Sequence, residues 1–377
     1  MTPLDIYGAV DASGNRLDVT VADRIVTTTA RSDRRFDATG LVILPGLIDI
    51  QTNGGIGHDF TQDPASIWEV GAWLPSTGVT AFCPTIITAP PGAIAQAQEA
   101  IRSRPNGYLG AEPLGLHIEG PHISVARHGA HSVELLRAPD EWSESTDNIS
   151  IVTIAPELPG ALGLIENLAR SGVVVSIGHS GASAEVATAA LDAGATLGTH
   201  LLNAMPPITA RDPGIAGVLL TDPRAYFNVI VDDFHLAPET MRLFWAAGKE
   251  RFVAITDAMA AAGMSDGTFA IGDIDVTLSN GAVRNSIGGL AGSSLTLDQG
   301  IRNIMAVTGA DLATASQSAT TRPADVLKLH DRGRLVPGAI GDLVLLDDLV
   351  VVATIVGGSI AFNQYPERLE GPSHAAP

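Results

Sequence analysis

Apolar runs alternate with helix-like segments through the middle of the chain. Eight runs are almost continuously apolar and end in polar residues: 41–51, 79–88, 114–120, 149–157, 173–180, 196–204, 226–233 and 251–258. Segments with apolar residues three and four positions apart lie between them, such as 91–104, 162–172, 184–194 and 238–250. Strands that read as unbroken apolar runs are typical of parallel sheets covered on both faces. The pattern therefore predicts an α/β protein built on a (β/α)8 TIM barrel, with a doubly wound open sheet as the competing architecture.

The two ends of the chain have a different pattern. Segments 4–10, 16–30 and 34–44 are short and alternating, and Gly, Asn and Asp interrupt them, as strands and turns require. The last 45 or so residues behave likewise. We predict that residues 1–45 and 335–377 together form one small β-sandwich domain and that residues 46–334 form the barrel. A segment with hairpin character, 267–286, precedes the predicted final helix at 294–309.

Charge and composition narrow the classes of partner. Lys and Arg number 22 against 41 Asp and Glu, which gives 22 − 41 = −19. A surface this acidic argues against nucleic acid and anionic membranes as partners. No apolar run approaches the roughly 20 residues that cross a bilayer, and the first residues lack the features of an export signal. The single cysteine, Cys83, permits no intrachain disulfide. We predict a soluble, cytoplasmic protein.

Polar residues follow the apolar runs where a barrel would carry its active site, at the C-terminal ends of the strands. These are Gln51, Asn53, His117, Glu119, His179, His200, Asp232, Asp233, His235 and Asp257. Each alone is more often a capping or hydrogen-bonding residue than a ligand. Together, Glu119, His179 and His200 offer one oxygen and two nitrogens and leave a position open for water, as catalytic zinc sites require. Asp257 would face that water, whereas amides such as Gln51 are poor zinc ligands.

The motifs around these positions are specific. They read "PGLIDIQTNG", "PTIIT", "LHIEGPHI", "GAHS", "SIGHS", "THLLNAMPPITARDPG", "DFHL", "TDAMAAAG" and "LAGSSLT". In this order, from about Pro45 to Arg302, they resemble the N-acetylglucosamine-6-phosphate deacetylases of the amidohydrolase superfamily. The resemblance implies hydrolysis of the acetamide of N-acetyl-D-glucosamine 6-phosphate to glucosamine 6-phosphate and acetate, in amino-sugar catabolism and cell-wall recycling.

The resemblance also implies a metal content. Glu119, His179 and His200 would bind one divalent ion per chain, with zinc the first choice and iron or cobalt also compatible with such ligands. Many amidohydrolases carry His-x-His on the first strand, which holds a second ion. Here the amides of Gln51 and Asn53 would line that vacated second metal position. The expectation is one metal ion, not two.

Further roles come from the same resemblance. Asp257 would be the general base and then the general acid, and His131 would stabilise the oxyanion. Contacts to the substrate would come from Ala130, His131, Asn203, Ala204, Arg211, His235, Leu290, Ala291 and Gly292. Arg211 would reach the phosphate from the neighbouring subunit, which implies a homodimer. Two residues depart from the family pattern: Asp233 replaces a common glycine beside the phosphate contacts, and Ala291 replaces a serine.

Three alternatives remain open at this point. An N-acetylgalactosamine-6-phosphate deacetylase would act on an epimer that differs at one hydroxyl group. A cyclic-amide hydrolase would need His-x-His and a bridging lysine, and no lysine lies near Glu119. A catalytically inactive sugar-phosphate-binding relative would have lost its metal, although all three ligands and Asp257 are present. Metal content measured together with acetate release distinguishes the last from the enzymes.

Overall fold

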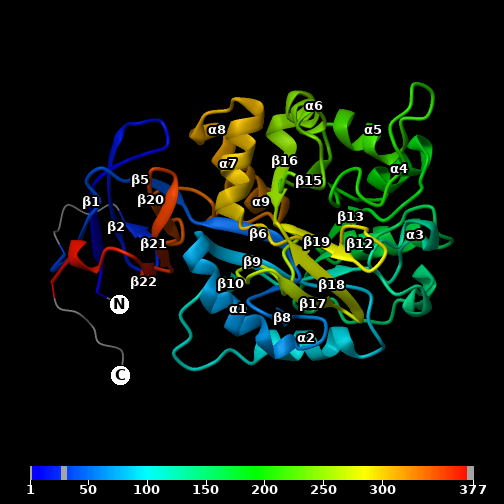
Figure 1. Cartoon of the computed structure of the whole chain (residues 1–377), viewed down its shortest axis with the longest axis horizontal. Coiled ribbons are helices and arrows are strands. Elements are labelled where there is room, and N and C mark those ends of the chain that lie inside the picture. The colour runs from blue at the N-terminus through cyan, green and yellow to red at the C-terminus, as the bar shows by residue number, and fades with distance from the viewer. Residues whose placement is uncertain (1, 27–31, 372–377) are drawn as a thin grey trace.

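The computed structural model describes residues 2–26 and 32–371, and the centre of this part is a parallel barrel (Figure 1). Its strands are β6 (Leu47–Thr52), β9 (Val79–Ile86), β11 (Leu116–Glu119), β12 (Ile149–Ile154), β13 (Val174–Ile177), β14 (Leu197–Gly198), β15 (Tyr226–Ile230) and β16 (Phe252–Ile255). Each pairs in parallel with the next in this order. A parallel bridge between Thr52 and Ala258 joins the last strand to the first. The predicted eight-stranded barrel is therefore confirmed.

Burial explains why the strands read as apolar runs. Every residue of β6 and β9 is buried, because helices cover the outside and other side chains fill the inside. One apolar cluster lies between strands and helices, and a separate cluster contains buried residues of seven barrel strands with Ala324 and Val326 of α9. Cys83 belongs to this second cluster and is a free thiol. The strands thus form a packed scaffold whose C-terminal ends are free to carry chemistry.

Helices follow most strands (Figure 1). They are α1 (Ile67–Trp73), α2 (Ala93–Arg102), α3 (Ala161–Arg170), α4 (Ala184–Asp192), α5 (Gly214–Thr221), α6 (Pro238–Gly248), α7 (Leu297–Thr308), α8 (Leu312–Ser316) and α9 (Thr321–Val326). The connection after β11 differs, because residues 120–148 contain only the short 3-10 turns η3 (Val125–Arg127), η4 (Val133–Leu135) and η5 (Pro139–Glu141). A long irregular loop, 199–213, also separates β14 from α5. Both irregular loops begin at the C-terminal edge of the barrel.

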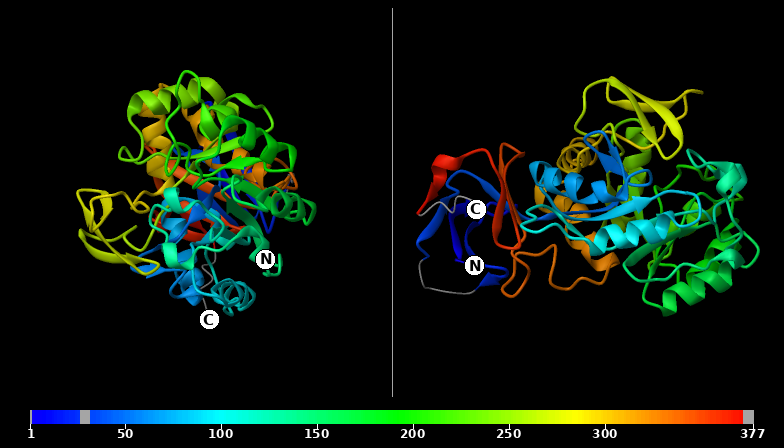
Figure 2. Two further views of the ribbon diagram at one scale, coloured as in Figure 1. Left: turned by 90° about the vertical axis from the view of Figure 1, so that its right-hand side faces the viewer. Right: turned by 90° about the horizontal axis from the view of Figure 1, so that it is seen from below.

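The predicted hairpin is a three-stranded antiparallel sheet of β17 (Gly267–Ile271), β18 (Ile274–Ser279) and β19 (Ala282–Asn285). Figure 2 shows it standing out from the barrel body, in yellow. Its apolar side chains form their own cluster with Ile87, Met259 and Ala291. The hairpin is therefore anchored beside the C-terminal end of β16, which it follows in the chain. A two-stranded ribbon, β7 (Gly54–Gly55) and β8 (His58–Asp59), follows β6.

Both chain ends build the small domain, as predicted. Its strands are β1 (Leu4–Val10), β2 (Arg16–Val21), β3 (Ile25–Val26), β4 (Arg34–Asp37), β5 (Val42–Pro45), β20 (Leu343–Asp347), β21 (Val350–Val356), β22 (Ser359–Asn363) and β23 (Leu369–Glu370). Hydrogen bonds connect them all: β1 pairs with β2 along one edge and with β4 and then β5 along the other. The sheet thus divides into two arms around its own apolar core. Positions 27–30 of one predicted strand segment, and 372–377, lie outside the described residues.

The first apolar run divides between the two domains at Gly46. β5 pairs with β20 in the small domain, and β6 enters the barrel. A side chain at Gly46 would begin 2.2 Å from the Thr80 hydroxyl oxygen, so the close passage of the two strands requires glycine. Leu44, Val344 and Leu346 of the small domain join the barrel's apolar cluster. The exact division at 45/46 and 334/335 remains our proposal.

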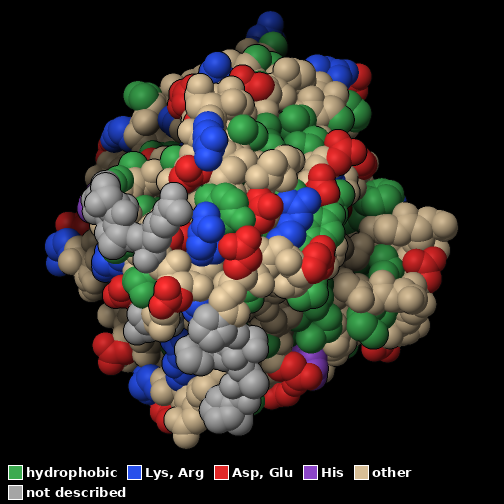
Figure 3. All heavy atoms as spheres, turned by 90° about the vertical axis from the view of Figure 1, so that its left-hand side faces the viewer, with side chains coloured by type: hydrophobic (Ala, Val, Ile, Leu, Met, Phe, Trp, Pro, Cys, Tyr) green, Lys and Arg blue, Asp and Glu red, His purple; other side chains and the backbone are tan. Residues whose placement is uncertain are grey.

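Two further features concern the outside of the molecule. On the face of the small domain in Figure 3, acidic and basic side chains lie next to one another, among the described residues of that face. Arg24 with Asp331 and Arg35 with Glu370 are examples of ion pairs in this domain or at its edge. Across residues 2–26 and 32–371, no helix is long and apolar enough to cross a membrane.

Candidate functional site

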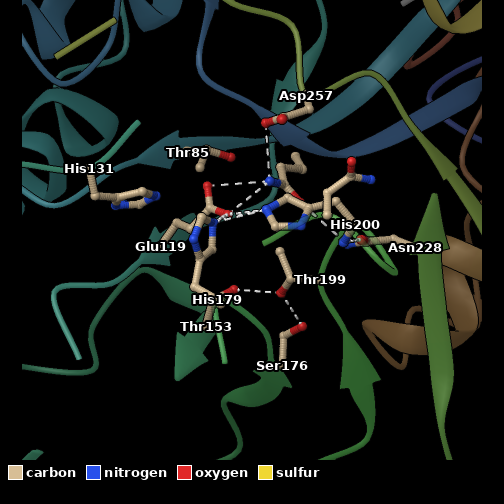
Figure 4. A network of polar contacts seen from close by, with 12 residues as sticks. Thr85, Glu119, His131, Thr153, Ser176, His179, Thr199, His200, Asn228 and Asp257 are labelled. Carbon is tan, nitrogen blue, oxygen red and sulfur yellow. Dashed lines mark hydrogen bonds and ion pairs between the residues drawn. The ribbon is translucent and has the colours of Figure 1, made fainter. Parts of the chain in front are cut away.

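Four predicted site residues meet at the C-terminal edge of the barrel (Figure 4). Glu119 ends β11, while His179, His200 and Asp257 each lie two residues beyond the last residue of β13, β14 and β16. The last three have positive φ angles of 48°, 29° and 51°. Residues other than glycine rarely adopt such angles. Those that do have a strained backbone, and they occur most often at functional sites. The chain therefore turns sharply at each strand end and directs these side chains into one space.

The donor atoms of Glu119, His179 and His200 converge on one point. Glu119 Oε1 lies 3.1 Å from His179 Nε2 and 3.0 Å from His200 Nε2, and the two nitrogens are 3.0 Å apart. All three side chains are buried. Three electron-pair donors this close repel one another unless a cation lies among them, and one carboxylate oxygen with two imidazoles is a ligand set that zinc accepts. The residues present therefore fit a divalent metal ion.

The surroundings of the imidazoles determine which nitrogen faces this point. His179 donates its Nδ1 proton to the backbone carbonyl of Arg127, at 2.8 Å, which leaves Nε2 with a free electron pair. His200 Nδ1 is buried without a hydrogen-bond partner among the described residues. Burial raises the pKa of Glu119, but its close contacts with His179 and His200 outweigh burial and hold that pKa well below its usual range. Glu119 is therefore ionised.

A second combination, Glu119, His131 and His179, also places one potential ligand atom from each residue within 4.8 Å of the others. The set with His200 is closely spaced, with 3.0–3.1 Å between each pair of its atoms. His131 Nδ1 is also engaged elsewhere, because it lies 2.8 Å from the Thr88 hydroxyl and accepts the Thr88 backbone N–H at 3.3 Å. We therefore assign the ligand set to Glu119, His179 and His200.

The contacts of His131 also fix its protonation. Because Nδ1 accepts a backbone N–H, the ring proton of neutral His131 is on Nε2. Burial, followed by the neighbouring His179, lowers the pKa of His131 to about 3. Its ring packs edge-on against that of His179, with centroids 4.5 Å apart. His131 is thus a neutral hydrogen-bond donor next to the candidate metal ligands.

Asp257 lies across the site from Glu119, and two amides hold it. Asn53 Nδ2 donates to Asp257 Oδ1 at 2.7 Å, and Gln51 Nε2 donates to the same oxygen at 3.1 Å. Gln51 Nε2 also lies 3.3 Å from both oxygens of Glu119. Burial and then the charge of Glu119 raise the pKa of Asp257 to about 6. The amides predicted to line the vacated metal position therefore donate hydrogen bonds to both carboxylates.

A cavity of about 260 Å³ opens in front of these groups. Its lining includes all the predicted substrate contacts except Arg211. The residues that line the cavity are Asn53, Ile87, Glu119, Gly129, Ala130, His131, His179, His200, Asn203, Ala204, Ile230, His235, Asp257, Ile271, Leu290, Ala291 and Gly292. Gln51 is fully buried and does not line the cavity. Arg211 is outside it, exposed on loop 199–213, with no ion pair to another described residue. The structure thus unites every predicted site residue except Arg211.

His235 also lines the cavity. Its Nδ1 lies 2.8 Å from Asp232 Oδ2, and Asp232 Oδ1 accepts the backbone N–H of His235 at 2.9 Å. This pair leaves His235 Nε2 available to a ligand. Asp233, the departure from the family pattern, is exposed and does not line the cavity. Its φ of 67° explains why glycine suits that position.

Sequence reasoning missed several residues that support the site. Thr88 binds His131, as described above. Asn228, in the middle of β15, contacts both Gln51 and the backbone of His200. Asp49, buried on β6, accepts hydrogen bonds from the Thr256 hydroxyl at 2.5 Å and from its backbone N–H at 3.3 Å. The available signal was a polar residue inside an otherwise apolar run, at a position that faces the barrel interior.

A chain of buried hydroxyl groups lies below the site (Figure 4). His117 Nε2 is 2.8 Å from Thr153 Oγ1, which is 2.8 Å from Thr199 Oγ1. Ser176 Oγ is 2.5 Å from the same Thr199 oxygen. Burial lowers the pKa of His117 to about 4, so it is neutral. His117, one of the polar residues singled out in the sequence, therefore belongs to this internal network and not to the ligand set.

Comparisons with known proteins agree with one another. The model of the amidohydrolase family matches residues 42–361. An N-acetylglucosamine-6-phosphate deacetylase of Danio rerio is 36% identical over 341 residues, covering 85% of this chain and 84% of the relative. An N-acetylgalactosamine-6-phosphate deacetylase of Escherichia coli O157:H7 is 37% identical over 330 residues, covering 85% and 88%. A solved mutant N-acetyl-D-glucosamine-6-phosphate deacetylase of Mycobacterium smegmatis, in complex with N-acetyl-D-glucosamine-6-phosphate, has a TM-score of 0.86 and 34% identity, covering 96% of this chain and 99% of that one.

Proposed function

The chain belongs to the amidohydrolase family, and we propose that it hydrolyses the acetamide of N-acetyl-D-glucosamine 6-phosphate to D-glucosamine 6-phosphate and acetate. One observation carries this proposal. The Glu119–His179–His200 set, the buried base Asp257 and the donor His131 all line a single cavity. An amide is a weak electrophile and water is a weak nucleophile. Amide hydrolysis therefore needs one group that takes a proton from the water and another that stabilises the charge on the carbonyl oxygen.

Glu119, His179 and His200 hold one divalent ion in this proposal. When bound, such an ion lowers the pKa of water and polarises a carbonyl oxygen. Zinc suits the ligands best, and iron or cobalt is compatible with them. Gln51 and Asn53 offer amides where a second ion would need imidazoles, and their N–H groups already point at carboxylates. This supports one metal ion per chain.

Asp257 moves the proton. Its Oδ1 accepts both amide hydrogen bonds, and its Oδ2 has no hydrogen-bond partner among the described residues. Oδ2 is therefore the atom that takes a proton from the attacking water. A pKa near 6 makes Asp257 ionised at neutral pH and still basic enough to hold that proton briefly. It then returns the proton to the amine, which cannot leave as an anion.

His131 stabilises the charge that develops on the carbonyl oxygen. Its Nε2–H faces the site because Thr88 occupies Nδ1. A neutral donor fixed before the reaction stabilises an oxyanion without reorganisation of solvent. The depressed pKa of His131 makes it a hydrogen-bond donor and not an acid at neutral pH.

The other end of the cavity would bind the sugar phosphate. His235, positioned by Asp232, and Asn203 with the backbone of Ala204 line that part of the site. The segment Leu290–Gly292 would contact the sugar, and the next residue, Ser293, donates its backbone N–H to the Asp257 carbonyl at 2.8 Å. Ala130 completes the contacts beside His131. Because Ser293 binds the backbone of Asp257, the segment that contacts the sugar would also fix the position of the sugar relative to Asp257.

Arg211 would complete the phosphate site from a second copy of the chain. Its guanidinium is exposed and lies outside its own cavity, and a guanidinium binds two phosphate oxygens at once. This supports a homodimer with two shared sites.

The composition also supports a cytoplasmic location, because a chain with a single cysteine suits a reducing compartment.

A second substrate is favoured by a specific observation, the 37% identity to the Escherichia coli N-acetylgalactosamine-6-phosphate deacetylase. The decisive experiment measures acetate release from both 6-phosphate epimers and from both unphosphorylated sugars, with the metal content determined on the same sample. We expect the glucosamine epimer with phosphate to have the highest kcat/KM. Preference for the galactosamine epimer would reassign the substrate, and metal-loaded protein that releases no acetate would refute the enzyme.

A further inference from the structure

We propose that Asn228 is a positioning residue that sets the orientation of the Gln51 amide and of the His200 backbone at the same time. This inference rests on the function proposed above. Asn228 is 1% exposed, lies inside β15 and does not line the cavity. It can therefore act only through the residues that it contacts.

The first contact concerns His200. The hydrogen-bonded ladder between β14 and β15 ends at Gly198 and Phe227, so the following N–H groups need other acceptors. His200 donates its backbone N–H to the side-chain oxygen of Asn228, and Leu201 donates to the Asn228 backbone carbonyl at 3.0 Å. These bonds hold the turn in which His200 has a φ of 29°. Without the side-chain oxygen, a buried N–H would be unpaired and the strained turn could relax.

The second contact concerns Gln51. Asn228 Nδ2 donates to Gln51 Oε1 at 3.4 Å, and the opposite side of the same amide, Nε2, faces Glu119 and Asp257. A glutamine amide has nearly the same shape when its oxygen and nitrogen are exchanged. The exchanged orientation would direct a carbonyl oxygen at two carboxylates and an NH2 group at the NH2 of Asn228. Asn228 therefore favours the orientation that the two acidic groups need.

Each contact predicts a separate effect. The His200 contact should govern metal affinity, since the backbone turn places an imidazole ligand. The Gln51 contact should govern kcat, since Gln51 holds Asp257 Oδ1. Residues that support metal ligands from behind typically change affinity or activity by about 10- to 100-fold when substituted.

The first experiment compares Asn228→Ala with Gln51→Ala and the double variant, each loaded with zinc. Asn228→Ala should lower kcat about 10- to 100-fold and change KM less than about threefold. In the Gln51→Ala background the same substitution should lower kcat less than about threefold, because both act on one group. Ser176→Ala is the matched control: Ser176 is equally buried, on β13, but among the described residues its side chain bonds only the Thr199 hydroxyl, so its kcat should stay unchanged. Effects that multiply in the double variant would refute the Gln51 contact.

The second experiment does not depend on turnover. Co²⁺ is titrated into metal-stripped protein, and its visible absorption reports binding. Asn228→Ala should weaken Co²⁺ binding about 10-fold or more, whereas Asn228→Asp, which keeps the acceptor for His200, should bind within about threefold of the unsubstituted chain. Asn228→Asp is close to isosteric, so it also serves if the alanine variant does not fold. Its kcat at alkaline pH, where the introduced carboxylate is ionised, should still fall.

The two proposals fail in different ways. Equal Co²⁺ affinity in all three chains would refute the His200 contact even in an active enzyme. If the unsubstituted chain releases no acetate, the proposed function fails, while the Co²⁺ titration still decides whether Asn228 positions His200.

Discussion

Replacing Asp257 by asparagine should abolish most turnover and yet stabilise the metal-free protein. Asn53 and Gln51 both donate to Asp257 Oδ1, so the introduced amide must place its carbonyl oxygen there and its NH2 group at the Oδ2 position. A donor would then stand where the proton acceptor is needed. General acid–base catalysis contributes about 10²- to 10⁴-fold, and because Asp257 acts as base and as acid we expect a loss of at least about 10³-fold in kcat.

The stability effect follows from the pKa. Burial raises the pKa of Asp257 from 3.8 to about 6, and this difference corresponds to roughly 3 kcal/mol. The folded-state pKa is raised, so the cost of ionisation is absent well below pH 3.8, grows as the pH rises through this interval and is complete above about 6. Asp257→Asn removes the charge. Urea unfolding of metal-stripped protein at pH 7 should therefore show a gain of up to roughly 3 kcal/mol that disappears towards pH 4.

Asp49 provides the matched control for this stability measurement. Burial raises the pKa of Asp49 to about 6 as well, but both its oxygens accept hydrogen bonds, from Thr256 and from the Gln51 backbone. Asp49→Asn would place an NH2 group where a bond is now accepted, so that bond must be lost or rearranged and the variant should gain less stability. An Asp257→Asn variant that kept about a tenth or more of turnover would remove Asp257 from the role of base. A variant that is active or less stable at pH 7 would refute the reasoning.

Three further predictions concern other groups of the site. Arg211→Ala should raise KM strongly for the 6-phosphate substrate and leave the slow reaction with the unphosphorylated sugar unchanged. Mixing this variant with Asp257→Asn should restore activity if subunits exchange. Exchange of subunits without recovery of activity would place Arg211 in the site of its own chain. His131→Ala should lower kcat about 10²- to 10³-fold with little change in KM, and a loss confined to KM would make it a binding residue. In a pH profile, kcat/KM should decrease as the pH drops and one proton binds to Asp257. The midpoint of this decrease should lie at about 6 or lower, because a bound cation favours the ionised form. A decrease centred at about 7 or above would contradict this prediction.

The sequence predicts the barrel well because each strand is buried on both sides and therefore reads as an apolar run. It predicts less well where structure departs from that rule. β14 is only Leu197–Gly198, although its apolar run covers 196–204, because His200 and the residues after it turn away from the ladder. The irregular connection after β11 carries His131 but no α-helix among its described residues, and nothing in its polarity distinguishes such a loop from a helical one.

In the candidate site too, the sequence indicates some residues and not others. Glu119, His179 and Asp257 could be found because their type and their place at strand ends both indicate chemistry. Asn228 could not, because one amide inside an apolar strand is equally compatible with a structural hydrogen bond. Arg211 lies outside the cavity of its own chain. Its proposed role in a neighbouring subunit came from the family resemblance, because local sequence patterns do not specify how two chains assemble.

A metal titration followed by acetate release tests the central claim most directly. Metal-stripped protein is supplied with zinc in steps, and acetate formation from N-acetyl-D-glucosamine 6-phosphate is measured at each step. We propose that Glu119, His179 and His200 hold one ion, and that Gln51 and Asn53, whose amide N–H groups donate to carboxylates, hold none. Acetate release should therefore rise in proportion to zinc and reach its plateau at about one ion per chain. A plateau that needs two ions per chain, or no acetate at any ratio, would contradict the single-metal deacetylase.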